Sequence, residues 1–277
     1  MTCVLHEKCN VMFLKIYVTL LDGSEYGIIE WTDRGMHIQT LDSLNVASCQ
    51  VDFPASWFHE YSWPVTTVTK FALRELQKLL MKRPSTTWGF HFRNEHAFDV
   101  VLGRERHRFK THVNLRRLSF SSHDYFHWPQ YTECPEKLNS AFLELATNGE
   151  LCFVTFGDTP NQVKFNTRNE IGHITVRTAP GEKRLQNPPT ERISNIYIMK
   201  FLKQMCTLIG VCQTATLFMT RDSPLILVLE LADHVKCTMA IAPVDRDELQ
   251  HTLPHQPWLQ QPPFWRVPRN KKQKTLL

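Results

Sequence analysis

The residues most able to do chemistry in this sequence are its thirteen histidines and eight cysteines. Four of the histidines fall on neighbouring predicted strands and turns: His91, His96, His107 and His112. None of them has a spacing that typically binds zinc, such as a C-x-x-C pair combined with H-x-x-x-H. We interpret them as scattered surface residues and expect neither a metal nor another cofactor.

The cysteines are also scattered and never form C-x-x-C. This is typical of reduced, mostly buried thiols in a cytosolic or nuclear protein, not of a disulfide framework. The sequence has no glycine-rich phosphate loop, no G-x-S-x-G and no acidic pair in a recognisable frame. We therefore predict that the protein is not an enzyme.

Composition sets broad limits on the class of protein. Of the 277 residues, 42% are hydrophobic and 21% are charged, which is typical of a soluble globular protein. No apolar run is long enough to span a bilayer, and the first ten residues lack the apolar core of a signal peptide. The formal net charge of +5 is compatible with nucleic-acid binding and equally with ordinary surface lysines.

The side chains that do follow a pattern are lysines and arginines on predicted helices. In residues 69–82, apolar residues recur at helical spacing, and basic residues recur every four positions as one stripe: Lys70, Arg74, Lys78 and Lys82. Two other predicted helices also carry lysines between or beside their apolar positions: Lys15 in residues 10–21, and Lys200 and Lys203 in residues 195–208.

These helices belong to a pattern that occurs four times. A predicted helix at 10–21, 69–82, 135–148 or 195–208 is followed each time by a run of strands separated by turn residues. This favours an α+β fold with helices packed on one face of antiparallel sheets. If the units are equivalent, the four helices lie side by side with their basic faces outward. Such a row suits the phosphates of a duplex, held without sequence readout.

Two segments depart from this pattern. Residues 119–134 have no period and carry several aromatic residues, which indicates a linker between an N-terminal domain (1–118) and a C-terminal domain (135–244). Residues 245–277 are rich in Pro and Gln and read as a disordered basic tail. Four basic residues of this tail are typical of a nuclear import signal or a further DNA-contacting arm: Arg269, Lys271, Lys272 and Lys274.

Three local strings carry a resemblance to a known family: RGMHIQTLDSLNVASCQV, QVKFNTRNEIGHITV and RDSPLILVLELADHVKCTMAIAP. In this order, with the linker and four helices between them, residues 1–244 resemble the DNA sliding clamps of the proliferating cell nuclear antigen (PCNA) type. The resemblance implies the DNA clamp fold, with two similar domains that each place two helices on one face of antiparallel sheets. It also implies a protomer that closes head to tail into a ring around duplex DNA.

The resemblance assigns roles to individual residues. Lys15, Lys78 and Lys200 match basic positions on the inner face of the family's ring, whereas Ser140 and Leu143 stand where the family usually has arginines. A pocket beside the linker, into which partner peptides insert aromatic plugs, would be formed by Leu41, Val46, Phe126, Trp128, Pro224, Ile241 and Ala242, with Asp42 on its rim. The residues alone leave a second interpretation open, in which the linker aromatics pin the linker onto the sheets.

Ring closure in the family pairs an edge strand of each protomer with an edge strand of the next. The matching strands here are 109–118 and 172–178, with interface residues Phe109, Lys110, Val113, Leu115, Ile174, Val176 and Thr178. Arg116 and Arg117 would instead keep the first edge solvated and the protein monomeric. The basic net charge is unusual beside acidic clamps. It favours a divergent clamp, with a viral origin as one interpretation, or an open monomer or dimer like the herpesvirus-type processivity factors.

The resemblance therefore implies a polymerase processivity factor that acts in the nucleus, in DNA replication and repair. Its expected partners are double-stranded DNA of any sequence, a DNA polymerase, a clamp loader and clamp-binding peptides, but no membrane. We expect a homotrimer, with a dimer or a monomer as alternatives. Two other functions stay open: a subunit of a heterotrimeric checkpoint-type clamp, and a non-enzymatic peptide-binding adaptor that kept the clamp fold.

Overall fold

A computed structural model describes residues 1–5, 9–21, 24, 26–81, 87–94, 97–110, 125, 127–157, 162–168, 173–177 and 185–245. Met1–Pro243 form one compact unit. The four basic residues predicted as a nuclear import signal lie outside the described residues. Within the described part of the chain, no helix is both long and apolar enough to cross a membrane.

The elements of the first half are β1 (Thr2–Leu5), α1 (Asn10–Leu21), β2 (Tyr26–Thr32), β3 (Gly35–Leu41), β4 (Ala47–Pro54), the 3-10 helix η2 (Ala55–Trp57), β5 (Phe58–Ser62), β6 (Thr67–Ala72), α2 (Leu73–Met81), β7 (Trp88–Asn94), β8 (Ala97–Leu102) and β9 (Glu105–Lys110). Those of the second half are β10 (Gln130–Glu133), α3 (Pro135–Ala146), β11 (Leu151–Phe156), β12 (Val163–Arg168), β13 (His173–Arg177), β14 (Leu185–Gln186), β15 (Ile193–Ile198), α4 (Met199–Ile209), β16 (Thr214–Phe218), β17 (Leu225–Glu230), η4 (Ala232–His234) and β18 (Lys236–Ile241).

The predicted repeat of a helix and a meander is present four times. Each helix is followed by three consecutive strands that pair antiparallel with one another. A strand also precedes each helix, namely β1, β6, β10 or β15, and the sequence pattern did not reveal these strands. The α+β fold class is therefore confirmed, and these four strands, β5 and β14 are present in addition to the expected ones.

Two of the four helices begin later than predicted. Residues 67–72 form β6, which pairs with β2, and residues 193–198 form β15, which pairs with β11. Neither segment, TVTKFA nor ISNIYI, alternates strictly between apolar and polar side chains, and their last apolar residues also fit the helical pattern that follows. The helix prediction therefore extended back over the strand. As a consequence, Lys70 lies on β6 and not on a helix.

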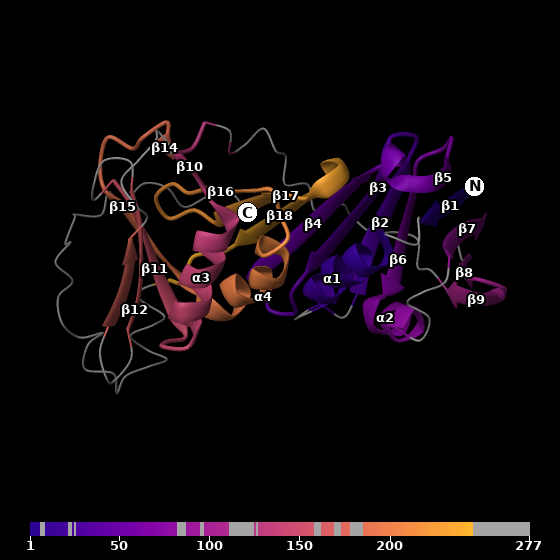
Figure 1. Ribbon diagram of the computed structural model, residues 1–277, viewed down its shortest axis with the longest axis horizontal. Coiled ribbons are helices and arrows are strands. Elements are labelled where there is room, and N and C mark those ends of the chain that lie inside the picture. The colour runs from indigo at the N-terminus through magenta and orange to yellow at the C-terminus, as the bar shows by residue number, and fades with distance from the viewer. Residues whose placement is uncertain are drawn as a thin grey trace. The chain divides into compact units, whose positions relative to one another are not determined.

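The strands form three sheets, ordered β5-β1-β7-β8-β9, β13-β12-β11-β15 and β14-β10-β16-β17-β18-β4-β3-β2-β6 (Figure 1). The nine-stranded sheet contains strands from both halves of the chain. Its halves meet where β18 pairs with β4, from Lys236 opposite Asp52 to Ile241 opposite Ala47. One continuous sheet therefore holds the two halves together.

The two faces of the nine-stranded sheet are occupied differently. In β17, Leu225, Leu227 and Leu229 join the main core, whereas Ile226 and Val228 lie in a separate cluster with Tyr125. This follows from the strand's alternation, which sends successive side chains to opposite faces. The helices belong to the main core, so the segment around Tyr125 covers the opposite face.

Aromatic side chains fill the core of the first half. The Phe13 ring of α1 lies 5.5 Å from the ring of Phe53 and about as close to those of Trp57, Trp88 and Phe90 (6.2, 6.1 and 6.2 Å). Residues 53–64, which are rich in aromatic side chains, thus belong to the core. They form the end of β4, η2 and β5.

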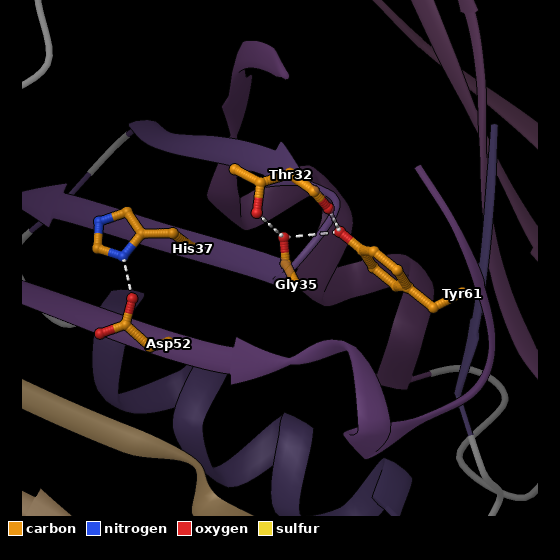
Figure 2. Close-up of polar contacts among 5 residues, drawn as sticks. All are labelled: Thr32, Gly35, His37, Asp52 and Tyr61. Carbon is orange, nitrogen blue, oxygen red and sulfur yellow. Dashed lines mark hydrogen bonds and ion pairs between the residues drawn. The ribbon is translucent and has the colours of Figure 1, made fainter. Parts of the chain in front are cut away.

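The turn between β2 and β3 shows how this segment is fastened (Figure 2). The Tyr61 hydroxyl lies 2.7 Å from the carbonyl oxygen of Thr32 and 2.6 Å from that of Gly35. Burial raises the pKa of Tyr61 well above its ordinary value, so the hydroxyl stays protonated and can donate. Gly35 has φ +148°, and a Cβ there would lie 2.1 Å from the Phe53 carbonyl oxygen. Only glycine, which has no Cβ, therefore fits at this position. Nearby, His37 Nδ1 lies 2.6 Å from an Asp52 carboxylate oxygen.

The helices contact one another in the order α2, α1, α4, α3 (Figure 1). The Tyr17 hydroxyl of α1 donates to the carbonyl of Leu73, the first residue of α2, at 2.8 Å. The Gln204 side chain of α4 donates to the carbonyl of Thr19 in α1. The predicted side-by-side arrangement of the four helices is therefore present.

Candidate functional site

On three of the four helices in the row, exposed cations outnumber acidic residues: Lys15 on α1, Arg74 and Lys78 on α2, and Lys200 and Lys203 on α4. Each of these helices buries most of its apolar residues on another side, as Leu73, Leu76 and Leu80 of α2 illustrate. Val11 of α1 and Met81 of α2 are exceptions, at 59% and 60% exposed. Glu75 is the single acidic residue in the sequences of the three helices. The exposed surface of α2, α1 and α4 is therefore strongly positive.

Two residues of the predicted stripe fall elsewhere. Lys70 lies on β6 opposite Ile28, and its ammonium group sits 4.5 Å from the centroid of the Tyr26 ring. Lys82 lies outside the described residues. The four-residue spacing therefore does not mark one helical stripe, because a strand and a helix share it. Arg74 and Lys78 remain as its helical members.

Helix α3 differs from the other three. Its exposed side chains are Glu136, Lys137, Ser140, Leu143 and Glu144. Leu143 keeps 45% of its surface exposed, although it is a large hydrophobic residue. The predicted departure at Ser140 and Leu143 therefore concerns residues on the exposed side of the helix. α3 adds two carboxylates and one ammonium group to the row, and no arginine.

A second candidate region surrounds the loop of residues 42–47, which we name the Asp42 loop. The Asp42 carboxylate accepts hydrogen bonds from the backbone N–H groups of Val46 at 2.6 Å, Ala47 at 2.7 Å and Leu44 at 3.1 Å. The Asp42 residue is only 7% exposed. The expected place of Asp42 on the rim of a pocket stays a prediction, and in the structure its carboxylate holds the backbone of the loop.

The Asp42 loop lies against the end of β18. The Ala242 N–H donates to the Val46 carbonyl at 2.7 Å, and Ile241 pairs with Leu225, the residue after Pro224. The structure thus brings together five residues predicted to line the pocket: Leu41, Val46, Pro224, Ile241 and Ala242. Four of them are half-buried, whereas Ile241 is fully buried and supports the others from the core.

The described part of the linker is fixed to the sheet by Tyr125. Its ring lies 4.9 Å from that of Phe218 and 6.5 Å from that of Trp128, and the Trp128 N–H donates to the Tyr125 carbonyl. Burial raises the pKa of Tyr125, and a hydrogen bond with Thr238 opposes that rise. Trp128 is half-buried on the same cluster, and Phe126 lies outside the described residues. Sequence reasoning did not single out Tyr125 among the neighbouring aromatic residues.

The first predicted interface strand, residues 109–118, overlaps β9, which the structure describes from Glu105 to Lys110. Residues 111–118 lie outside the described residues. Phe109 stacks on Phe98 at 5.4 Å and packs against the core, as Val176 of β13 does. Lys110 and Ile174 lie on β9 and β13, whereas Val113, Leu115, Thr178 and the Arg116–Arg117 pair lie outside the described residues. β9 and β13 each end their sheet in the part of the chain that the structure describes.

The histidines and cysteines form no reactive cluster in this region. Among the described residues, no group of three or more His, Cys, Asp or Glu side chains is placed to hold a metal ion. All eight cysteines are free, and six of them are buried. Burial raises the pKa of several thiols, including Cys152 and Cys206, which disfavours the reactive thiolate form.

Two solved structures match this arrangement over 88% of the chain. The PCNA2–PCNA3 complex from Sulfolobus tokodaii has a TM-score of 0.72 and 14% identity, with 99% of that chain covered. A. fulgidus PCNA bound to the C-terminal region of FEN-1 has a TM-score of 0.74 and 13% identity, with 98% of that chain covered. The chain has the fold of a PCNA-type sliding clamp. No family model matches the sequence, and no curated protein matches it either.

The clamp fold confirms the expected architecture and is consistent with strong divergence in sequence. With identities of 13% and 14%, the similarity establishes the fold and not the roles of individual side chains. In this clamp fold, three features therefore have to be judged from their own geometry: the basic row of helices, the half-buried residues beside the Asp42 loop, and the two sheet edges.

Proposed function

We propose that this chain is a subunit of a DNA sliding clamp that holds duplex DNA without regard to sequence and tethers a DNA polymerase and other peptide-carrying proteins. The observation that carries the proposal is the contiguous row of helices, in which α2, α1 and α4 expose five cations and one acidic residue away from the core. The two predicted domains, residues 1–118 and 135–244, would each supply two helices to this row.

The chemistry of the row fits a sliding contact. Lysine and arginine side chains on exposed helix faces attract phosphates, and this attraction does not distinguish one base sequence from another. Each such contact is weak and screened by salt, so the protein can move along the duplex while it stays associated. Enclosure of the duplex by a ring would supply the retention that these contacts lack.

The region beside the Asp42 loop supplies a docking place for a tethered protein. Leu41, Val46, Pro224 and Ala242 are half-buried at neighbouring positions, and Leu44 at the tip of the loop is 74% exposed. An apolar surface of this kind favours the insertion of apolar or aromatic side chains from a peptide. The similarity to A. fulgidus PCNA, which binds the C-terminal region of FEN-1, supports the same use here.

The proposal is tested by measuring how salt weakens the affinity of the chain for duplex DNA. The variant Lys15→Ala/Lys78→Ala/Lys200→Ala removes one cation from each basic helix. A matched control, Arg34→Ala/Arg104→Ala/Arg221→Ala, removes three exposed cations from turns. We expect the slope of log K against log salt to become shallower by up to about 3 in the helix variant, at about 0.9 for each lost phosphate contact. Equal affinities and slopes for the two variants would refute the DNA-binding face.

A second candidate function is a peptide-binding adaptor that kept the clamp fold. The acidic and partly apolar surface of α3 favours it, because Glu136, Leu143 and Glu144 do not attract phosphates. An adaptor would bind peptides equally well with or without the three lysines and would show no salt-dependent binding to duplex DNA. The same pair of variants therefore separates the two functions. Action in the nucleus remains a proposal, tested by the location of the full chain in cells after removal of residues 269–274.

A further inference from the structure

The edge strand β9 presents a row of cations on the face of its sheet that points away from the core. In β8, Phe98, Val100 and Leu102 are buried in the core, so Asp99 lies on the opposite face. Arg108 pairs with Asp99 across the two strands, and Arg106 pairs with Val101. Both arginines therefore share the outer face with Asp99, and their side chains are 60% and 59% exposed.

The carboxylate of Asp99 holds these cations in place. Arg93 Nε lies 2.5 Å from one of its oxygens, Arg108 Nε lies 3.5 Å from the other, and the Arg106 guanidinium lies 3.8 Å away. The Asp99 side chain is only 2% exposed. Burial acts to raise the pKa of Asp99, but the hydrogen bond and charge of Arg93 and the charge of Arg108 outweigh it and hold the pKa below its ordinary value. One carboxylate thus organises three guanidinium groups, which leaves a positive excess at the edge.

The other sheet edge, β13, carries charge of the same sign. Its register places Arg177 opposite Lys164 and His173 opposite Arg168 of β12. Val163 and Phe165 are buried in the core, so the register of Lys164 and its partners assigns them to the face away from the core. The two strands, VKFNTR and HITVR, contain no acidic residue. Among the described residues of these two strands, the outer face therefore carries cations and no carboxylate.

Pairing β9 of one copy with β13 of another would bring these two basic faces together. In a continuous sheet the core sides align, so Phe109 and Val176 would lie on one side and the cations of both strands on the other. Side chains directly opposite each other on paired strands have Cβ atoms about 4.5–5.5 Å apart, and like charges at that distance are destabilising. Two copies of this chain are therefore poorly suited to each other, although each edge is a free edge in the described sheets.

We propose that this chain assembles with a second, different clamp-type chain whose edge strand presents aspartate or glutamate on its outer face. The planar guanidinium groups of Arg106 and Arg108 on β9 suit carboxylates in geometry as well as in charge. The partner's acidic edge would pair with β9, and a second acidic edge would pair with β13. This inference rests on the proposed clamp function, because it concerns which chains complete the assembly.

The test reverses the charge of one edge and measures self-association by light scattering of the full chain at low salt. We expect the wild type to have the mass of one chain. The variant Arg106→Glu/Arg108→Glu has an acidic β9 and a basic β13, so its copies complement one another. We expect it to form a higher-mass assembly with an affinity at least about tenfold above that of the wild type. Salt at about 0.5 M should weaken this assembly.

Three further variants control for the change in net charge and for loss of stability. Arg34→Glu/Arg221→Glu reverses two exposed arginines on turns and lowers the formal net charge from +5 to +1, as the edge variant does, so it should stay monomeric. Lys164→Glu/Arg177→Glu reverses the other edge and leaves the Asp99 contacts intact, so it should self-associate even if the first variant is unstable. The variant with both edges reversed should be monomeric again, because its edges are both acidic.

The outcomes separate this inference from the proposed function. A wild type that forms a salt-resistant oligomer would overturn the inference and leave the DNA-binding face untouched. Folded single-edge variants that both remain monomeric, as judged by circular dichroism and light scattering, would also overturn it. Duplex binding is measured separately with Lys15→Ala/Lys78→Ala/Lys200→Ala, which leaves both edges intact. A self-associating edge variant that stays on closed circular DNA and leaves linear DNA would support both proposals together.

Discussion

Replacement of Asp42 by alanine tests whether one buried carboxylate holds the loop beside the candidate pocket. In the structure, that carboxylate accepts three backbone N–H groups, from Leu44, Val46 and Ala47. Leu44 is 74% exposed, so water can replace its lost hydrogen bond, whereas the Ala47 residue is 4% exposed. The variant therefore leaves the N–H groups of Ala47 and, in part, of Val46 without an acceptor.

The expected loss follows from these contacts. A hydrogen bond to a charged group contributes about 1.5–3 kcal/mol, and a buried donor left unsatisfied costs about 1–3 kcal/mol. With one buried and one half-buried donor stranded, we expect the free energy of unfolding to fall by about 3 kcal/mol. For a compact unit of this size, that corresponds to a fall in Tm of about 6–12 °C. Asp42→Asn, which keeps one acceptor oxygen, should lose about half as much.

The assay is thermal unfolding of the full chain together with amide hydrogen exchange. Ser43→Ala is the matched control, because Ser43 is an exposed neighbour in the same loop. We expect faster exchange at Val46 and Ala47 in Asp42→Ala, and a native-like rate in Ser43→Ala. If Asp42→Ala melted within about 1 °C of Ser43→Ala, the carboxylate would not be holding the loop and the reasoning would fail.

Two further predictions concern the linker and the β9 edge. Tyr125→Ala should lower the free energy of unfolding by about 3 kcal/mol, because it removes a buried ring from Phe218, and should speed proteolysis of the linker; an unchanged cleavage rate would contradict this. The depressed pKa of Asp99 means that its charge stabilises the fold above its unfolded pKa of about 3.9 and ceases to do so as pH falls through its lower folded pKa. The difference in unfolding free energy between wild type and Asp99→Asn, measured by urea titration, should thus shrink between about pH 5 and pH 2. A constant difference would show that the charge of Asp99 does not stabilise the fold.

The helices themselves could be predicted, but not where two of them begin. α1 and α3 begin where the sequence indicated, and α3 has Pro135 in its first turn, which favours that start. β6 and β15 run directly into α2 and α4 with no intervening turn. The apolar residues at each junction satisfy both a period of two and a helical period, so local pattern cannot place the boundary. The short strands β1 and β10 likewise have too few residues to show alternation.

Residues of the candidate site could be predicted where local sequence pattern places them, and not where contacts between distant segments do. Lys15, Lys78 and Lys200 stand out because amphipathic helices separate charged from apolar positions within a few residues. The role of Asp42 depends on three backbone groups whose direction only the folded loop sets. The β9 edge, ERHRFK, has too many charges to read as a strand, and it is held in the sheet by pairing with β8. Likewise, the pairing of β4 with β18 joins residues that are almost 190 positions apart.

Two basic regions of the described chain have different physical consequences. The cations of α1, α2 and α4 are exposed side chains of helices, whose backbone hydrogen bonds are already made within each helix, so a polyanion can approach them without any protein pairing. The cations of β9 and β13 stand beside unpaired strand edges, where another strand must come to within about 4.8 Å before a hydrogen bond forms. Charge at the helices therefore changes the affinity for a charged ligand, whereas charge at the edges determines which protein strands can pair with them. Under the two proposals above, a duplex would complement the helices, and a neighbour of opposite charge would complement the edges. This division would let one clamp fold be basic both where it meets DNA and where it meets protein.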